Sequence, residues 1–249
     1  MIHRIAGAVF GAVGLWLTLS APSLAADIAC RQQSPEVFVL TGEIDQALAD
    51  CVAERLQPTT REVILNSRGG SVGPALDIAE RFEGRRLTMR VRNECNSSCA
   101  NFFLPLAGRL VVERGAIIGL HGSLDPMLIA HTRQRGQPVD ALTRTAERQM
   151  AFARRNDIHP GWLMYRLADE TSVQGLDGEW GGQIAEARMF IVEERMARSC
   201  LPNVEIEPYQ ADLDAGPLRP DRAERLHRRG IARSATVVCN AVGWEAATP

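Results

Sequence analysis

Residues 61–71 read REVILNSRGGS, and this stretch decides the expected fold. Residues 61–65, with an aliphatic run at 63–65, are typical of a buried strand, and the segment 66–70 with its glycine pair ends it. Ser71 is a suitable N-cap for a helix whose apolar residues recur on one face. Those residues are Val72, Leu76, Ala79 and Phe82. The stretch therefore predicts a strand that leads directly into a helix.

The same arrangement recurs on both sides of this stretch. Further strands are predicted at 36–40, 87–91, 110–112 and 116–120, and helices at 47–56 and 97–107. Strands that alternate with helices at this spacing are typical of βαβ units and a largely parallel sheet. Beyond it, helical patterns occupy 138–155, 160–167 and 184–196, and a β-like run occupies 235–241.

The first 25 residues have the pattern of a signal peptide. A charged start at His3 and Arg4 precedes an apolar run at 5–19, and small residues precede a cleavage site after Ala25. A retained membrane anchor is the alternative, but the run is shorter than the roughly 20 residues that a spanning helix needs. A lipid anchor on Cys30 lacks the usual small residues before it. We expect a periplasmic or secreted protein with no stable membrane anchor after cleavage.

Length and composition favour one α/β domain with a small appendage. We assign residues 26–199 to the domain and 200–249 to a Pro- and Asp-rich extension. The formal charge of −2 gives no reason to expect a nucleic-acid partner. All 28 basic residues counted as Lys or Arg are arginine. Mechanisms that need a lysine base, a Schiff base or a P-loop lysine are therefore excluded.

Six cysteines remain after cleavage, an even number that indicates disulfides in an oxidising compartment. Six cysteines allow fifteen pairings. Their order along the chain favours three pairs: Cys30 with Cys51, Cys95 with Cys99, and Cys200 with Cys239. A zinc site is the alternative, but no pair has the close spacing of a zinc knuckle, and no metal is expected.

Three local features could carry chemistry, and each also has a structural interpretation. Gly69 and Gly70 could expose backbone amides to a ligand, or could simply form a tight turn. Ser97 and Ser98 stand where a strand meets a helix, so one hydroxyl could be a nucleophile or a helix cap. His121 ends a predicted strand, where a histidine is either structural or a base.

Taken together and in this order, these features resemble the proteolytic subunit of Clp protease and the wider Clp-protease and crotonase superfamily. The matching segments are VLTG at 39–42, LNSRGG at 65–70, SSCA at 97–100 and IGLH at 118–121. The resemblance covers roughly 36–123. It implies an α/β fold of repeated ββα units with a mostly parallel sheet flanked by helices. Because superfamily members assemble, it also implies a homo-oligomer.

The resemblance assigns roles to individual residues. The family's nucleophilic serine falls on Ser98 and its general base on His121. The oxyanion hole falls on the backbone amides of Gly70 and Cys99. Such a set of nucleophile, base and fixed donors is what acyl transfer needs, without a cofactor.

The third member of the triad is an acid in a later segment of the family. Asp177 is our candidate, and Asp169 is a second option. Arg68 stands where the family usually has proline in the glycine turn. Cys99 as a thiol nucleophile is a competing idea, disfavoured because an oxidising compartment and a partner four residues away favour a disulfide.

These observations predict an exported, ATP-independent serine hydrolase, a peptidase that acts on peptide or protein substrates through an acyl-enzyme. The alternative is a catalytically inactive relative that binds peptides or proteins. Crotonase-type chemistry on acyl-CoA is disfavoured, because coenzyme A is not expected outside the cytoplasm. A serine and lysine dyad is excluded by the absence of lysine.

Overall fold

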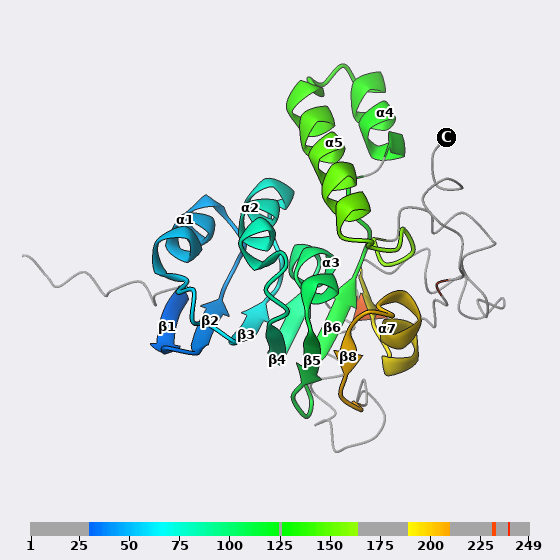
Figure 1. The fold of residues 1–249 in the computed structure, drawn as a ribbon. Helices are drawn as coiled ribbons and strands as arrows, with labels where there is room; N and C mark the ends of the chain where they lie inside the picture. Colours follow the sequence, from blue (N-terminus) through cyan, green and yellow to red (C-terminus); the bar gives the residue numbers. More distant parts are fainter. Residues whose placement is uncertain (1–29, 125, 164–188, 210–230, 233–238, 240–249) are drawn as a thin grey trace, which may run out of the picture.

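A computed structural model describes residues 30–124, 126–163, 189–209, 231–232 and 239 (Figure 1). The predicted signal peptide and most of the extension lie outside these residues. The strands are β1 (Cys30–Ser34), β2 (Val37–Thr41), β3 (Glu62–Ser67), β4 (Thr88–Asn96), β5 (Arg109–Val112), β6 (Ile117–Leu120), β7 (Met189–Ile191), β8 (Glu205–Ile206) and β9 (Ile231–Ala232). The helices are α1 (Gln46–Arg55), α2 (Val72–Phe82), α3 (Ser98–Phe102), the 3₁₀ turn η1 (Leu104–Leu106), α4 (Pro126–Gln134), α5 (Asp140–Arg155) and α7 (Glu194–Cys200).

The strands form one mixed sheet in the order β1-β2-β3-β4-β6-β7-β9, and β5 joins β4 to β8. Strands β2 to β6 pair in parallel, while β1 and β7 are antiparallel to their neighbours β2 and β6. Helices α1, α2 and α3 cover one face of the sheet (Figure 1). The predicted α/β architecture with a mostly parallel, helix-flanked sheet is confirmed.

Strand β4 changes partner along its length. Its first half, from Thr88 to Val91, pairs with β5, and its second half, from Glu94 to Asn96, pairs with β6. Asn93 lies between the halves with φ 63°, a conformation that asparagine tolerates better than most residues. The strand is therefore longer than the predicted 87–91. Its second half ends beside the end of β6.

Three predicted helices differ in the structure. The helix expected at 97–107 stops early and continues as η1, because Pro105 has no N–H to extend an α-helix. Of the helix expected at 160–167, residues 160–163 form turns, and the rest lies outside the described residues. Of the helix expected at 184–196, residues 184–188 lie outside the described residues, and the rest forms β7 and the start of α7. Pairing of β7 with β6 overrides the local helical pattern.

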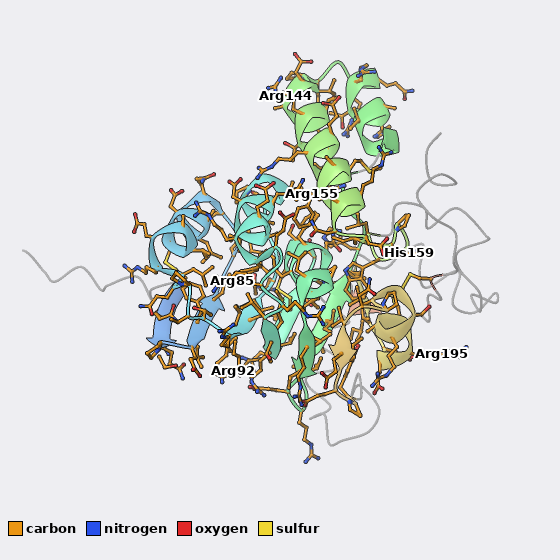
Figure 2. The ribbon with its side chains drawn as sticks, viewed as in Figure 1. Arg85, Arg92, Arg144, Arg155, His159 and Arg195 are labelled. Atoms are coloured by element: carbon orange, nitrogen blue, oxygen red, sulfur yellow. A yellow bond between two sulfur atoms is a disulfide. The ribbon has the colours of Figure 1, made fainter. Side chains whose placement is uncertain are left out.

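Helices α4 and α5 form a hairpin that projects from the sheet, and α4 was not predicted (Figure 1). The inner end of α5 packs against α2 and α3. Phe152 of α5 meets Phe102 of α3 edge to face, with ring centroids 6.1 Å apart. Figure 2 shows Arg155 at the inner end of α5 and Arg144 near its outer end. The hairpin is thus anchored at one end only within the described residues.

Three disulfides tie the described chain together. They join Cys30 to Cys51, Cys95 to Cys99 and Cys200 to Cys239, with Cα–Cα distances of 6.1, 5.3 and 4.9 Å. The structure confirms the pairing expected from the order of the cysteines. In the part of the chain that the structure describes, no helix combines the length and apolar character needed to cross a bilayer.

Candidate active site

Ser97 occupies the turn between β4 and α3 in an unusual backbone conformation. Its φ is 54° and its ψ is −127°, a region that a residue with a side chain rarely adopts. A residue held this way costs about 1–3 kcal/mol and persists only where its surroundings impose it. Sharp strand-to-helix turns of this kind can present a nucleophile at the end of a sheet.

The Ser97 hydroxyl meets the imidazole of His121. Their Oγ and Nε2 atoms are 2.6 Å apart, within hydrogen-bonding distance. Two neighbouring parallel strands bring them together, because Asn96 of β4 pairs with Gly119 of β6. The Ser97 N–H also donates to the Gly119 carbonyl at 2.7 Å, which fixes the turn to the sheet. His121 is exposed and Ser97 is partly buried, so the pair lies at the surface.

The structure corrects the expected partner of His121, which was Ser98. Ser98 is the first residue of α3 and is only 2% exposed. Its hydroxyl donates to the carbonyl of Gly70 at 2.7 Å. The side chains of adjacent residues diverge here because the chain changes from strand to helix between them. The hydroxyl at the imidazole is therefore that of Ser97, and Ser98 instead ties the helix start to the glycine turn.

The glycine pair packs directly against this junction. A Cβ on Gly69, whose φ is +90°, would lie 2.6 Å from both the Asn96 carbonyl oxygen and the Ser97 Cβ. A Cβ on Gly70 would lie 2.2 Å from the carbonyl oxygen of Ile44. Both contacts are far too short for a side chain. Only glycine allows the turn after β3 to approach Ser97 this closely.

The turn after β3 presents the backbone of Gly70 to the start of α3. The Ile44 carbonyl accepts from the Ser71 N–H, and the Ile44 N–H donates to the Gly69 carbonyl. Because these bonds use the two neighbours of Gly70, the backbone of Gly70 itself faces away from Ile44 and toward Ser98. The amide that follows Ser97 is that of Ser98. The oxyanion donors that the resemblance assigns to Gly70 and Cys99 remain predictions, and Ser98 carries the amide directly after the serine that meets His121.

The disulfide between Cys95 and Cys99 spans the Ser97 turn. Cys95 is the next-to-last residue of β4 and Cys99 the second residue of α3, and both are fully buried. The bond joins the strand to the helix on either side of the strained residue. Cys99 is consequently not a free thiol, and the described chain has no free cysteine.

The expected third member of the triad cannot be placed, because Asp177 and its alternative Asp169 lie outside the described residues. Within the described residues, the polar partner of the His121 ring is the Ser97 hydroxyl. The orientation of this ring therefore depends, in the described chain, on the backbone that carries His121.

Two buried polar residues near the site were missed by the sequence analysis. Asn96 is fully buried and donates to Glu94 at 2.6 Å, and Arg68 lies 3.9 Å from that carboxylate. Gln149 of α5 is also fully buried and contacts the segment after His121. The one sequence signal for Gln149 is its spacing from Phe152, which places a polar residue on the apolar face of a helix.

Among the described residues, no group of three or more His, Cys, Asp or Glu side chains could hold a metal ion. Comparison of the chain with models of protein families and with the sequences of curated proteins gives no match.

Proposed function

We propose that this chain is an exported serine hydrolase of the Clp-protease type, a peptidase that works without ATP. The observation that carries the proposal is the 2.6 Å contact between the Ser97 hydroxyl and His121 at a strained strand-to-helix turn. A hydroxyl paired with an imidazole beside backbone donors is the arrangement that acyl transfer requires. The mostly parallel α/β fold supports the resemblance of residues 36–123 to that superfamily.

In the proposed reaction, the Ser97 Oγ attacks the carbonyl carbon of a peptide bond while its proton passes to His121 Nε2. The N–H groups of Gly70 and Ser98 stabilise the negative oxygen that forms. As the carbon–nitrogen bond breaks, the leaving amine takes the proton from His121. Water then attacks the acyl-enzyme, again with His121 as base, and releases the acid and the free serine.

The proposed location outside the cytoplasm rests on two features. The signal-peptide pattern at 1–25 precedes the described chain, and three disulfides tie that chain together. Disulfides of this kind persist in oxidising compartments such as the periplasm. Separation from cytoplasmic nucleotide is the reason to propose an ATP-independent enzyme.

A second candidate function is peptide or protein binding without catalysis. One observation favours it: the described residues offer no carboxylate to the ring of His121, which in a triad is oriented by an acid. The two functions differ in whether any serine is activated.

Labelling with a fluorophosphonate probe separates the two functions, because the probe reacts with an activated serine. We expect the oxidised chain from Ala26 onward to be labelled on Ser97, as located by fragment mass spectrometry. Ser97→Ala should abolish labelling, and His121→Ala should reduce it to a small residual rate. Ser98→Ala is the matched control in the adjacent serine and should still be labelled. A wild-type protein that is not labelled would contradict the hydrolase and support the binding function.

A further inference from the structure

The segment that follows His121 is held by a buried side chain from a distant helix. Gln149 of α5 is fully buried, and its amide nitrogen donates to the Leu124 carbonyl at 2.9 Å. Its amide oxygen accepts from the Ser123 hydroxyl. The Gln149 amide thus bonds both Ser123 and Leu124, which follow His121 after Gly122. A buried polar group that is satisfied in this way is costly to disturb.

The backbone of His121 therefore lies between two fixed points. On one side, β6 is bonded to β4 and β7 up to Leu120. On the other side, Ser123 and Leu124 are bonded to Gln149. Gly122 turns the chain between them with φ 87°. If the bonds to Gln149 are lost, the turn at Gly122 can change conformation, and the backbone of His121 can shift with it.

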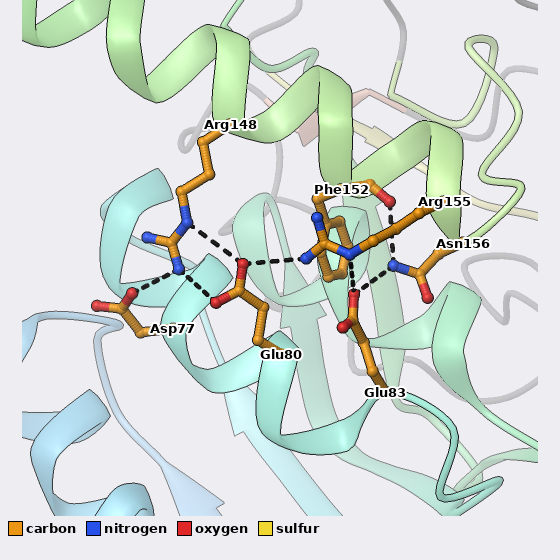
Figure 3. A network of polar contacts seen from close by, with 7 residues as sticks. All are labelled: Asp77, Glu80, Glu83, Arg148, Phe152, Arg155 and Asn156. Carbon is orange, nitrogen blue, oxygen red and sulfur yellow. Dashed lines mark hydrogen bonds and ion pairs between the residues drawn. The ribbon is translucent and has the colours of Figure 1, made fainter.

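Helix α5 is itself firmly placed, so it can act as the support. Figure 3 shows Arg148 and Arg155 of α5 bridging to acidic residues of α2. Arg148 contacts Asp77 and Glu80, each at 2.7 Å, and Arg155 contacts Glu80 at 3.0 Å. The Phe102 and Phe152 rings join the same helix to α3, which starts directly after Ser97. One helix thus touches the elements that carry both members of the proposed pair.

We propose that Gln149 is a positioning residue for the reaction, which acts through the 122–124 segment to hold the His121 imidazole at the Ser97 hydroxyl. The inference rests on the proposed function. In the described chain the His121 ring has no other polar partner than Ser97, so its direction follows from its backbone. Gln149 does not touch the reacting atoms.

The test compares the labelling rate of the wild type with that of Gln149→Met, which keeps the shape of the side chain but removes its hydrogen bonds with Ser123 and Leu124. We expect its rate with the fluorophosphonate probe to fall by about 10- to 100-fold, since a misplacement of about 1 Å can cost about 100-fold. Ser123→Ala removes one bond at a partly exposed position and should cause a smaller loss. Arg144→Met is the matched control, because it replaces an exposed residue near the outer end of the same helix.

A double-mutant cycle distinguishes positioning from general loosening. At saturating probe, Gln149→Met should not lower the residual rate of His121→Ala any further, because its effect passes through the imidazole. A wild-type rate in Gln149→Met overturns the inference. So does an equal loss in the His121→Ala background, or an equal loss in Arg144→Met. If Gln149→Met does not fold, Ser123→Ala decides, and a wild-type rate in that variant overturns the inference.

A second readout is independent of catalysis. The ring nitrogen resonances of His121, assigned with His121→Ala, should shift in Gln149→Met and Ser123→Ala but not in Arg144→Met. If the wild-type protein is not labelled at all, the proposed hydrolase fails, while these resonances still test the positioning. Unchanged His121 resonances in Gln149→Met and Ser123→Ala would then overturn it.

Discussion

Ser97→Gly and Ser97→Ala should both be inactive, but Ser97→Gly should be the more stable of the two. Both variants lose the hydroxyl that meets His121, so they differ only in how well they tolerate the backbone at this turn. Alanine keeps a Cβ at φ 54° and ψ −127°, whereas glycine adopts that region without a steric penalty.

The size of the effect follows from two opposing contributions. Removing the Cβ should relieve about 1–3 kcal/mol of backbone strain. The greater freedom of glycine in the unfolded chain offsets about 0.5–1 kcal/mol of this gain. The free energy of unfolding of Ser97→Gly should therefore exceed that of Ser97→Ala by up to about 2.5 kcal/mol. At about 2–4 °C per kcal/mol, its Tm should be higher by up to about 10 °C.

Urea unfolding of the oxidised proteins, followed by circular dichroism, measures the difference. Asn93→Gly is a matched control, since Asn93 also has positive φ, at 63°, but lies outside the proposed reaction. It should gain stability and keep wild-type labelling. Ser98→Gly should lose stability, because Ser98 lies in a helix. A Ser97→Gly variant less stable than Ser97→Ala would refute the strained turn.

Three further perturbations test the surroundings of the site. Ser98→Ala leaves the Gly70 carbonyl without its buried donor, and should lower the free energy of unfolding by about 1–3 kcal/mol in urea titrations. Replacing Cys95 and Cys99 together with alanine should lower the free energy of unfolding by about 2 kcal/mol, because the disulfide closes so short a loop. Wild-type stability of the double variant would argue against a stabilising role of this disulfide. Burial acts to raise the pKa of Glu80, but hydrogen bonds and charge from the two arginines of α5 outweigh it and lower the pKa below its ordinary value. This stabilisation is present at neutral pH and is lost as the pH falls through the lowered pKa. Glu80→Gln should thus be less stable than wild type by about 0.5–1 kcal/mol at pH near 7, and in parallel urea titrations the difference should shrink as the pH falls below 4.5, the ordinary pKa of the carboxyl.

The parts of the fold that could be predicted are those that local sequence encodes. Strands β3 and β6 are short aliphatic runs, and α2 has apolar residues on one face, so their residue types alone indicate them. The second half of β4 could not be found in this way. It contains Arg92, Asn93 and Glu94, and its pairing with β6 depends on contacts far apart in the chain.

The same limit applies to the candidate site. The glycine turn, the serine pair and His121 were predicted to converge, because each follows a strand of one parallel sheet. Which serine meets the imidazole depends on the backbone angles of one residue, and Ser97 and Ser98 are identical in type. The role of Gln149 depends on how α5 docks, which no local pattern encodes.

Because β4 changes partner and its second half pairs with β6, backbone pairing sets the distance between the two members of the proposed catalytic pair. Ser97 and His121 follow adjacent parallel strands, so their separation derives from the regular spacing of hydrogen-bonded strands, about 4.8 Å. Natural variants or engineered chains could therefore lengthen the tip of the α4–α5 hairpin, or be circularly permuted there, and keep the same spacing between the hydroxyl and the imidazole.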